Sequence, residues 1–232
     1  MKVTLVSHPI VAPEFYDRLK GTEMGEREQS LGSPYVDDAD LVPEAAGRVC
    51  YDSFDLPNPA TRNNADYLAN IKRQLHFSVL EHSNFTFHVA EVSRALLAEI
   101  TRHRHLSFSV RSQRYCWEGD SQMVIPSALL GDDARDLQVR ILKLQGEAKE
   151  LYGDVVGHLM ANGFKRKEAH DAARYVLPEG THTEFYVTGN GRAWLEFLAK
   201  RDSPHAAQEI RELAGLIKWE LCQVAPGMFT SD

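Results

Sequence analysis

Hydrophobic residues recur along this chain with two spacings, one typical of strands and one typical of helices. In NFTFHVAEV, Phe85, Phe87 and Val89 alternate with polar neighbours, which is the period of a strand with one buried face. We also predict strands in KVTLVSHP at the N-terminus and through SQRYCW, residues 112–117. The segment TEFYVTGNGRAWLEFLAKR predicts a further strand, a glycine turn and then a helix.

Helical spacing dominates the remaining periodic segments. NADYLANIKRQLH has apolar residues three or four positions apart, and Ser93 is expected to cap a helix that runs into Arg102. A long helix is predicted from about Ala134 to Asn162, ended by Gly163. The apolar positions on one side of these three helices are Ala65, Leu68, Ile71 and Leu75; Leu96, Leu97 and Ile100; and Leu137, Ile141, Leu144, Leu151 and Val155.

Two more helices are predicted towards the C-terminus. KRKEAHDAARYV should form a helix that stops near Pro178, because proline cannot continue one. Ser203 and Pro204 suit the cap and first position of a last helix. Its apolar face carries Ile210, Leu213, Ile217 and Leu221. By contrast, the segment from Thr22 to Asp55 is expected to be mainly loop, with a short helix near Ala45 to Tyr51.

Strands and helices that follow one another without regular alternation predict an α+β (mixed α/β) fold rather than a doubly wound one. We expect a central antiparallel-type sheet flanked by helices, one of them long. With 232 residues the chain is long enough for one large domain or two small ones. We expect a single domain over residues 1–232.

Composition narrows the functional classes. Hydrophobic residues at 43% and charged residues at 25% are ordinary for a soluble globular protein. No apolar run reaches the roughly 18 residues of a membrane span, and the N-terminus lacks a signal peptide, so we expect a cytoplasmic protein without membrane partners. With a net charge of -7, general attraction to nucleic acid is not expected. Three scattered cysteines indicate neither structural disulfides nor a zinc cage.

Against this acidic background, residues 102–114 hold four arginines, two histidines, three serines and no carboxylate. An exposed basic patch is one interpretation. However, Arg102 and Arg104 fall where their helix should end, and the serines add hydroxyl donors. Planar guanidinium forks together with hydroxyls suit phosphate oxygens. The cluster therefore favours a nucleotide ligand.

Three other features are weaker. Gly189 and Gly191 bracket a turn that can bring backbone amides to a phosphate, although a plain turn is the default interpretation and a Rossmann site is not expected. The histidines, among them His76, His103 and His105, match no metal-binding spacing, so we expect no metal. Cys116 is open to two interpretations, a nucleophile with a lowered pKa or a buried and inert thiol.

At these residues the chain resembles a known family, the flavin-dependent thymidylate synthases. RHRHLSFSVRS, residues 102–112, has the family's RHR, seven residues and then serine. LHFSVLEH before it, and AARYVLP, TGNGRAW and AKRDSPHA after it, agree in order and spacing. The likeness runs from about Ala46 to Ala225.

The resemblance implies a homotetramer with a mixed α/β fold and with FAD bound where subunits meet. It also implies conversion of dUMP to dTMP, with methylenetetrahydrofolate as the carbon donor and NADPH as the reductant of the flavin. FAD and dUMP would bring several phosphate charges into one pocket, which a cationic wall would offset. By the same resemblance, the enzyme would need no cysteine nucleophile.

The motif positions carry over to individual residues. The resemblance implies FAD contacts for Ser78, His76, Arg102, His103, Arg104, Asn190, Gly191, Arg192 and Glu196. It implies dUMP contacts for Glu99, Arg102, Val110, Arg111, Ser112, Gln113, Arg114, Arg174 and Arg201. Arg201 matches the arginine that activates the uracil, because a guanidinium against the ring carbonyl and N3 stabilises negative charge there.

Two positions depart from the family, and two other functions stay open. Val110 stands where Glu or Gln is frequent, and Arg111 stands where an apolar residue is usual, so it either contacts phosphate or points to solvent. A thiol-dependent pyrimidine methylase would use Cys116 and carry no flavin. A nucleotide- or RNA-binding module without catalysis would use the arginines only for affinity.

Overall fold

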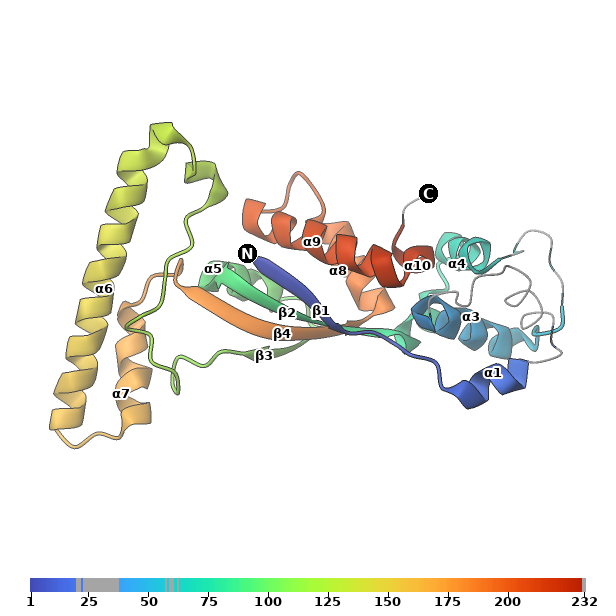
Figure 1. Ribbon diagram of the computed structural model, residues 1–232, viewed down its shortest axis with the longest axis horizontal. Coiled ribbons are helices and arrows are strands. Elements are labelled where there is room, and N and C mark those ends of the chain that lie inside the picture. Colours follow the sequence, from blue (N-terminus) through green and yellow to red (C-terminus); the bar gives the residue numbers. More distant parts are fainter. Residues whose placement is uncertain (20–21, 23–37, 57, 59–60, 62, 231–232) are drawn as a thin grey trace.

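A four-stranded antiparallel sheet lies at the centre of the part of the chain that the structure describes (Figure 1). This computed structural model describes residues 1–19, 22, 38–56, 58, 61 and 63–230. The strand order is β1-β2-β4-β3, with β1 Lys2–Ser7, β2 Asn84–Ser93, β3 Ser107–Val110 and β4 His182–Asn190. The predicted mixed α/β class with an antiparallel sheet is confirmed.

Helices surround this sheet at its ends and on one face. The α-helices are α1 Pro13–Leu19, α3 Asp38–Tyr51, α4 Asn64–Arg73, α5 Arg94–Ile100, α6 Arg135–Ala161, α7 Arg166–Ala173, α8 Gly191–Arg201, α9 Gln208–Val224 and α10 Pro226–Phe229. The short 3-10 helices are η2 Phe77–His82, η3 Ser127–Leu129, η4 Asp132–Ala134 and η5 Arg174–Val176. Figure 1 shows α6 and α7 at one end of the sheet and α1, α3 and α4 at the other, with α8 and α9 along one face.

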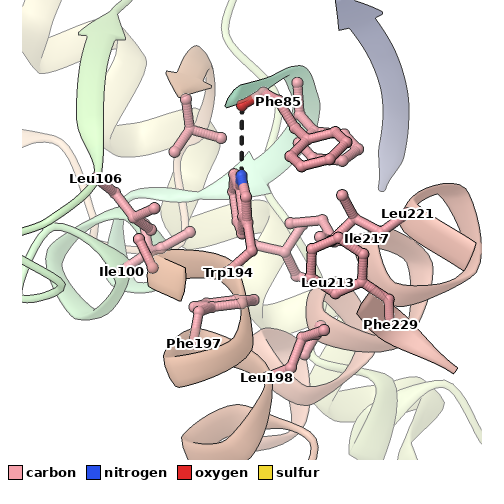
Figure 2. Close-up of a cluster of buried hydrophobic side chains, with 14 of the residues drawn as sticks. Phe85, Ile100, Leu106, Trp194, Phe197, Leu198, Leu213, Ile217, Leu221 and Phe229 are labelled. Atoms are coloured by element: carbon pink, nitrogen blue, oxygen red, sulfur yellow. Dashed lines mark hydrogen bonds between the residues drawn. The ribbon is translucent and has the colours of Figure 1, made fainter. Parts of the chain in front are cut away.

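The core lies between that face of the sheet and helices α5, α8 and α9. Alternate residues of β2, among them Phe85 and Phe87, point into it and are fully buried. Trp194 of α8 fills the centre, and its indole N–H donates to the Phe85 carbonyl at 3.3 Å (Figure 2). The predicted apolar face of α9 is buried against the same cluster. This packing fixes α8 and α5, the two helices that carry the candidate site.

The start of α5 is held from two sides. The Ser93 hydroxyl accepts a hydrogen bond from the Leu96 amide at 2.9 Å, which is the predicted N-cap. Ser93 also donates its backbone N–H and its hydroxyl to the two carboxylate oxygens of Glu209, at 2.8 and 2.5 Å. Because α5 is only seven residues long, this anchor determines where its C-terminal end places residues 101–104.

The junction of β4 and α8 depends on a close backbone approach. The Asn190 side chain caps α8 by accepting from the Ala193 amide at 2.9 Å, and the Gly191 N–H donates to the Ser83 carbonyl at 2.8 Å. A Cβ atom on Gly191 would lie 2.8 Å from the Leu80 carbonyl oxygen, so only glycine fits without a shift of backbone. The predicted strand, glycine turn and helix are confirmed, with no residue between β4 and α8.

Several predicted boundaries are wrong. Residues 112–117 form a turn rather than a strand, because the Ser112 carbonyl accepts from the amides of Tyr115 and Cys116. The strand lies earlier, at β3, where it pairs with β4. The last helix begins at Gln208 with Ala207 as its cap, since Ser203 and Pro204 belong to the turn before it.

The N-terminal segment that was expected to be loop contains more helix than predicted. α3 begins at Asp38, not at Ala45. The short helix α1, which precedes that segment, was not predicted either. Residues 23–37 of that expected loop lie outside the described residues.

The long helix is confirmed as α6, but the three leucines of its predicted apolar stripe are exposed, whereas Val155 packs toward α7. Leu137, Leu144 and Leu151 are 45%, 56% and 49% exposed. The side of α6 that packs against α7 instead buries Tyr152 and Val156. The described helices include none that is long and apolar enough to cross a membrane.

Candidate active site

Arg102 and Arg201 line the same cavity, which has a volume of about 450 Å³. The segment that follows α5 lines it with Arg102, His103 and Arg104, and α8 lines it from Ala193 to Arg201. Arg102 and Arg104 are exposed, and neither takes part in an ion pair found among the described residues. This cavity therefore offers cationic donors that the surrounding protein does not neutralise directly.

Arg201, the last residue of α8, is held by two acceptors. Its Nε donates to His103 Nε2 at 2.9 Å, and its guanidinium donates to Glu99 Oε1 at 2.6 Å. Only 20% of the Arg201 side chain is exposed. A guanidinium has five N–H donors, so others remain for a ligand. The sequence analysis singled out all three residues, and the structure brings them into contact.

The charges around His103 disfavour its protonation. Burial lowers the pKa of the imidazole, and the neighbouring Arg201 and Lys200 lower it further, against a smaller opposing effect from Glu196. The ring also packs edge-on against Phe197, with centroids 5.1 Å apart. These effects favour a neutral imidazole, which is the form that can accept the hydrogen bond from Arg201.

Glu196 lines the same cavity but is already engaged. Its carboxylate accepts from Lys200 Nζ at 2.5 Å, and this hydrogen bond lowers the pKa of Glu196. The charges of Glu196 and Lys200 therefore offset each other, beside the cationic residues 102–104 that line the same cavity. The sequence analysis named Glu196 but not Lys200.

A second cavity, of about 440 Å³, gathers several predicted nucleotide contacts. Gln113 and Arg174 line it together with Thr101 and Arg94. Arg114 Nε and an Arg174 terminal nitrogen each lie 3.1 Å from Oδ1 of Asp171. One carboxylate thus holds two predicted dUMP arginines from separate segments. Ser112 begins the turn of residues 112–117, and its hydroxyl accepts a hydrogen bond from the Arg114 amide at 3.3 Å.

The remaining predicted FAD contacts border a third cavity, of about 310 Å³. His76, Ser78 and Arg192 line it at the junction of α4, η2 and α8. Arg192 forms an ion pair with Glu81 at 2.7 Å. The Asn190 side chain caps α8, and Gly191 allows the close backbone approach to Leu80. Among the described residues, no group of three or more His, Cys, Asp or Glu side chains is placed to hold a metal ion.

Arg111 is partly exposed, and it lies close to two carboxylates of its own chain. Its side chain lies 3.4 Å from Glu118 and 3.7 Å from Glu184, at the wall of a cavity of about 720 Å³. Glu118 is almost completely buried, and burial raises its pKa while Arg111 lowers it. Val110, at the end of β3, is half-buried against the core.

Cys116 is half-buried in the turn after Ser112, and it borders the Arg111 cavity rather than that of Arg201. It thus does not line the cavity in which the RHR segment and Arg201 meet. Sequence reasoning missed Asp171, Glu118 and Lys200 as partners of site residues. Glu118 reaches Arg111, and Asp171 reaches Arg114, only through folding. Asp171 with Arg174 and Glu196 with Lys200 are instead one helical turn apart, at spacings that favour an ion pair.

Comparison with known proteins gives a consistent family. The sequence profile of the family described as "Thymidylate synthase complementing protein" matches residues 34–227. A "Probable flavin-dependent thymidylate synthase" of Mycobacterium phage D29 is 46% identical over 207 residues, 85% of this chain and 88% of the relative. That of Mycobacterium phage L5 is 45% identical over 90% of this chain and 88% of the relative.

A cellular relative gives the same result. The "Flavin-dependent thymidylate synthase" of Mycobacterium tuberculosis is 43% identical over 206 residues, which cover 84% of this chain and 82% of that protein.

Proposed function

The chain belongs to the thymidylate synthase complementing protein family, and we propose that it converts dUMP to dTMP as a flavin-dependent thymidylate synthase. The observation that carries the proposal is the meeting of the RHR segment with Arg201 in one cavity. Phosphate needs cationic donors and uracil needs a directed hydrogen-bond donor, and this cavity offers both.

The donor set around the cavity fits an FAD cofactor. Arg102 and Arg104 expose guanidinium groups beside His103, which suits the pyrophosphate of a dinucleotide. Ser78, His76 and Arg192 at the third cavity, with the Asn190–Gly191 junction and Glu196, would hold other parts of the cofactor. Bound there, the flavin would supply the hydride chemistry, and the residues of this chain would orient the reactants.

Arg201 would bind the uracil ring through the donors that Glu99 and His103 leave available. A guanidinium fixed against the ring carbonyl and N3 stabilises negative charge as the ring attacks the one-carbon unit. Glu99 fixes Arg201 at 2.6 Å and thus orients this charge. In this mechanism Cys116 has no role, which agrees with its position outside the cavity. We propose methylenetetrahydrofolate as the carbon donor and NADPH as the reductant.

We propose that dUMP phosphate binds at the second cavity, through Ser112, Gln113, Arg114 and Arg174. Arg114 and Arg174 converge on Asp171, which keeps both guanidiniums at one place. Arg111 and Val110 would contribute backbone contacts, since the Arg111 side chain is occupied by Glu118 and Glu184.

We further propose that the complete site forms in a homotetramer. The predicted ligand contacts of one chain divide among separate cavities, and the exposed stripe of α6 at Leu137, Leu144 and Leu151 offers an apolar surface for a second copy. Light scattering of the purified protein should give a mass four times that of the 26.2 kDa chain. A 26.2 kDa monomer in the presence of FAD would contradict this assembly.

The direct test of the function is the absorbance of the purified protein with a turnover assay. We expect flavin absorption between about 350 and 500 nm and oxidation of NADPH that depends on dUMP. Two outcomes would favour the binding module without catalysis: absence of a flavin spectrum, and no change of protein fluorescence on addition of FAD.

A further inference from the structure

We propose that His103 is a positioning residue for Arg201, which it holds by accepting a hydrogen bond as a neutral imidazole. The proposal rests on the proposed function, because uracil is the group that Arg201 would meet. The contact on which it stands is the 2.9 Å hydrogen bond from Arg201 Nε to His103 Nε2.

His103 and Glu99 bind the guanidinium at two different nitrogens. Nε donates to His103, and NH1 donates to Glu99 at 2.6 Å. Two acceptors at separate nitrogens of a planar group fix both its place and the orientation of its plane. The other terminal nitrogen, NH2, keeps its two N–H donors for a ligand. An arginine held by Glu99 alone could still turn about that single contact.

The hydrogen bond determines the protonation state of His103. Arginine has no acceptor and is always charged, so Nε2 must carry a lone pair and the ring proton must be on Nδ1. The charged groups around the ring are mainly cations, which favour this neutral form, and Glu196 opposes them with a smaller effect. From α8 these are Arg201, Lys200 and Glu196; from α5 the nearby charge is Glu99; and from its own segment they are Arg102, Arg104 and His105.

Protonation of His103 would therefore disrupt the site. The imidazolium loses the acceptor lone pair and places a second cation against Arg201, so the guanidinium moves away while Glu99 retains one end. Burial, Arg201 and Lys200 lower the pKa of His103. Activity is thus retained at neutral pH and lost as the pH falls through that lowered value, below the ordinary histidine range near about 6.5.

The first experiment needs no turnover. Protein labelled with ¹⁵N-histidine, assigned with His103→Gln, is examined by long-range ¹H–¹⁵N correlation NMR. At neutral pH we expect an unprotonated Nε2 and a protonated Nδ1. In Arg201→Gln the pKa of His103 should rise towards the ordinary value of about 6.5, because the adjacent charge is gone. A proton on Nε2, or a pKa that does not change in Arg201→Gln, would overturn the proposal.

The second experiment compares the pH dependence of kcat for dTMP formation at saturating dUMP. His103→Gln keeps a neutral acceptor that does not titrate, so it should remain active and lose the acid limb of the profile. His103→Leu has no acceptor, and its kcat should fall by about 10- to 100-fold, the usual cost of a misplaced catalytic group. Flavin absorbance of each variant shows whether the cofactor is still bound.

His88→Gln is the matched control. His88 contacts Glu184 and Tyr186 on the other face of the sheet, so this variant should keep the wild-type acid limb. If His103→Gln also keeps it, or if His103→Leu matches His103→Gln in kcat at neutral pH, His103 does not position Arg201. If no variant and no wild-type protein makes dTMP, the proposed function fails, and the NMR experiment still decides on His103.

Discussion

At the residue scale, the arginines of the basic segment differ in their partners. Residues 102–114 contain no carboxylate, yet folding brings Glu118 and Asp171 to Arg111 and Arg114. Arg102 and Arg104 enter none of the ion pairs among the described residues, and they line the cavity of Arg201. Arg111 and Arg114 thus pair with carboxylates of their own chain, which the sequence did not predict, whereas Arg102 and Arg104 line the cavity in which we propose a ligand binds.

Asp171 should influence substrate affinity rather than the chemical step. We expect Asp171→Asn to raise the KM for dUMP with little change in kcat, because Arg114 and Arg174 lose the carboxylate that holds them. The increase in KM should be only roughly threefold to fivefold, since partly exposed ion pairs contribute little free energy. Steady-state kinetics checks this. Glu147→Gln, which removes an exposed ion pair with Lys143 on α6, is the control and should leave KM unchanged. An unchanged KM in Asp171→Asn would contradict this role.

Arg111 should matter for stability through its buried partner. Arg111→Ala leaves the Glu118 carboxylate buried without its cation, so we expect the free energy of unfolding to fall by about 1–3 kcal/mol. Because the lost cation raises the pKa of Glu118 further, the loss should be largest above that pKa and shrink as the pH falls and Glu118 is protonated. Denaturant unfolding of Arg111→Ala and of Arg111→Ala/Glu118→Gln at two pH values tests this. Equal losses in both variants would refute it.

At the element scale, elements with strong local signals were predicted, both helices and the strands β1, β2 and β4. The cap at Ser93, the spacing in α4 and the length of α6 are encoded by neighbouring residues, and each was predicted. The strand predicted at 112–117 was wrong because pairing decides strands: Ser107 to Val110 lie opposite Phe185 to Thr188 of β4. Ser203 failed as a cap since its segment forms a turn before α9.

The part of the candidate site that lies in one local segment could be predicted from the sequence, whereas contacts between distant segments could not. RHR and serine form a local motif, so residues 102–112 could be identified from the sequence. Arg201 lies 98 positions from His103 in the sequence, and only the family resemblance connected the two residues. In the structure Arg201 Nε lies 2.9 Å from His103 Nε2. Glu118 had no sequence signal, because a lone acidic residue on a polar segment is indistinguishable from a solvated one. Asp171 lies three positions before Arg174, a helical spacing that favours an ion pair, but no local pattern connects it to Arg114.

The anchor of α5 should couple stability to cofactor binding. Ser93→Ala removes the cap and the hydroxyl contact to Glu209, so we expect a loss of about 1–2 kcal/mol in the free energy of unfolding and weaker flavin binding, since α5 leads into residues 102–104. Thermal unfolding and flavin titration measure both. Ser127→Ala loses an exposed serine–glutamate bond and should change stability by less than about 0.5 kcal/mol. Unaltered flavin affinity in Ser93→Ala would separate the anchor from the site.

At the scale of the whole molecule, the apolar stripe of α6 is the feature that a single chain does not explain. Leu144 is 56% exposed in the middle of a 27-residue helix. Exposed apolar stripes on long helices commonly mark contacts between subunits. The sequence thus predicted the existence and length of α6 correctly, but the face that α6 buries within this chain differs from the one that its leucines indicated.

A charge on this stripe should disrupt the proposed tetramer. We expect Leu144→Glu to shift the mass measured by light scattering towards smaller species and to reduce flavin absorbance, because sites completed between subunits would be lost. Leu56→Glu is the matched control, since Leu56 is 60% exposed and follows α3 at the other end of the sheet. An intact tetramer in Leu144→Glu would place the subunit contact elsewhere.

The measurement that bears most directly on the central claim is the rate of dTMP formation in two variants, Arg201→Ala and Cys116→Ala, each with flavin bound. If the guanidinium held by His103 and Glu99 activates the uracil, Arg201→Ala should lose at least about 100-fold in kcat, as for other groups that stabilise developing charge. Cys116→Ala should retain activity near that of the wild type. Loss of activity in Cys116→Ala together with an active Arg201→Ala would contradict the account.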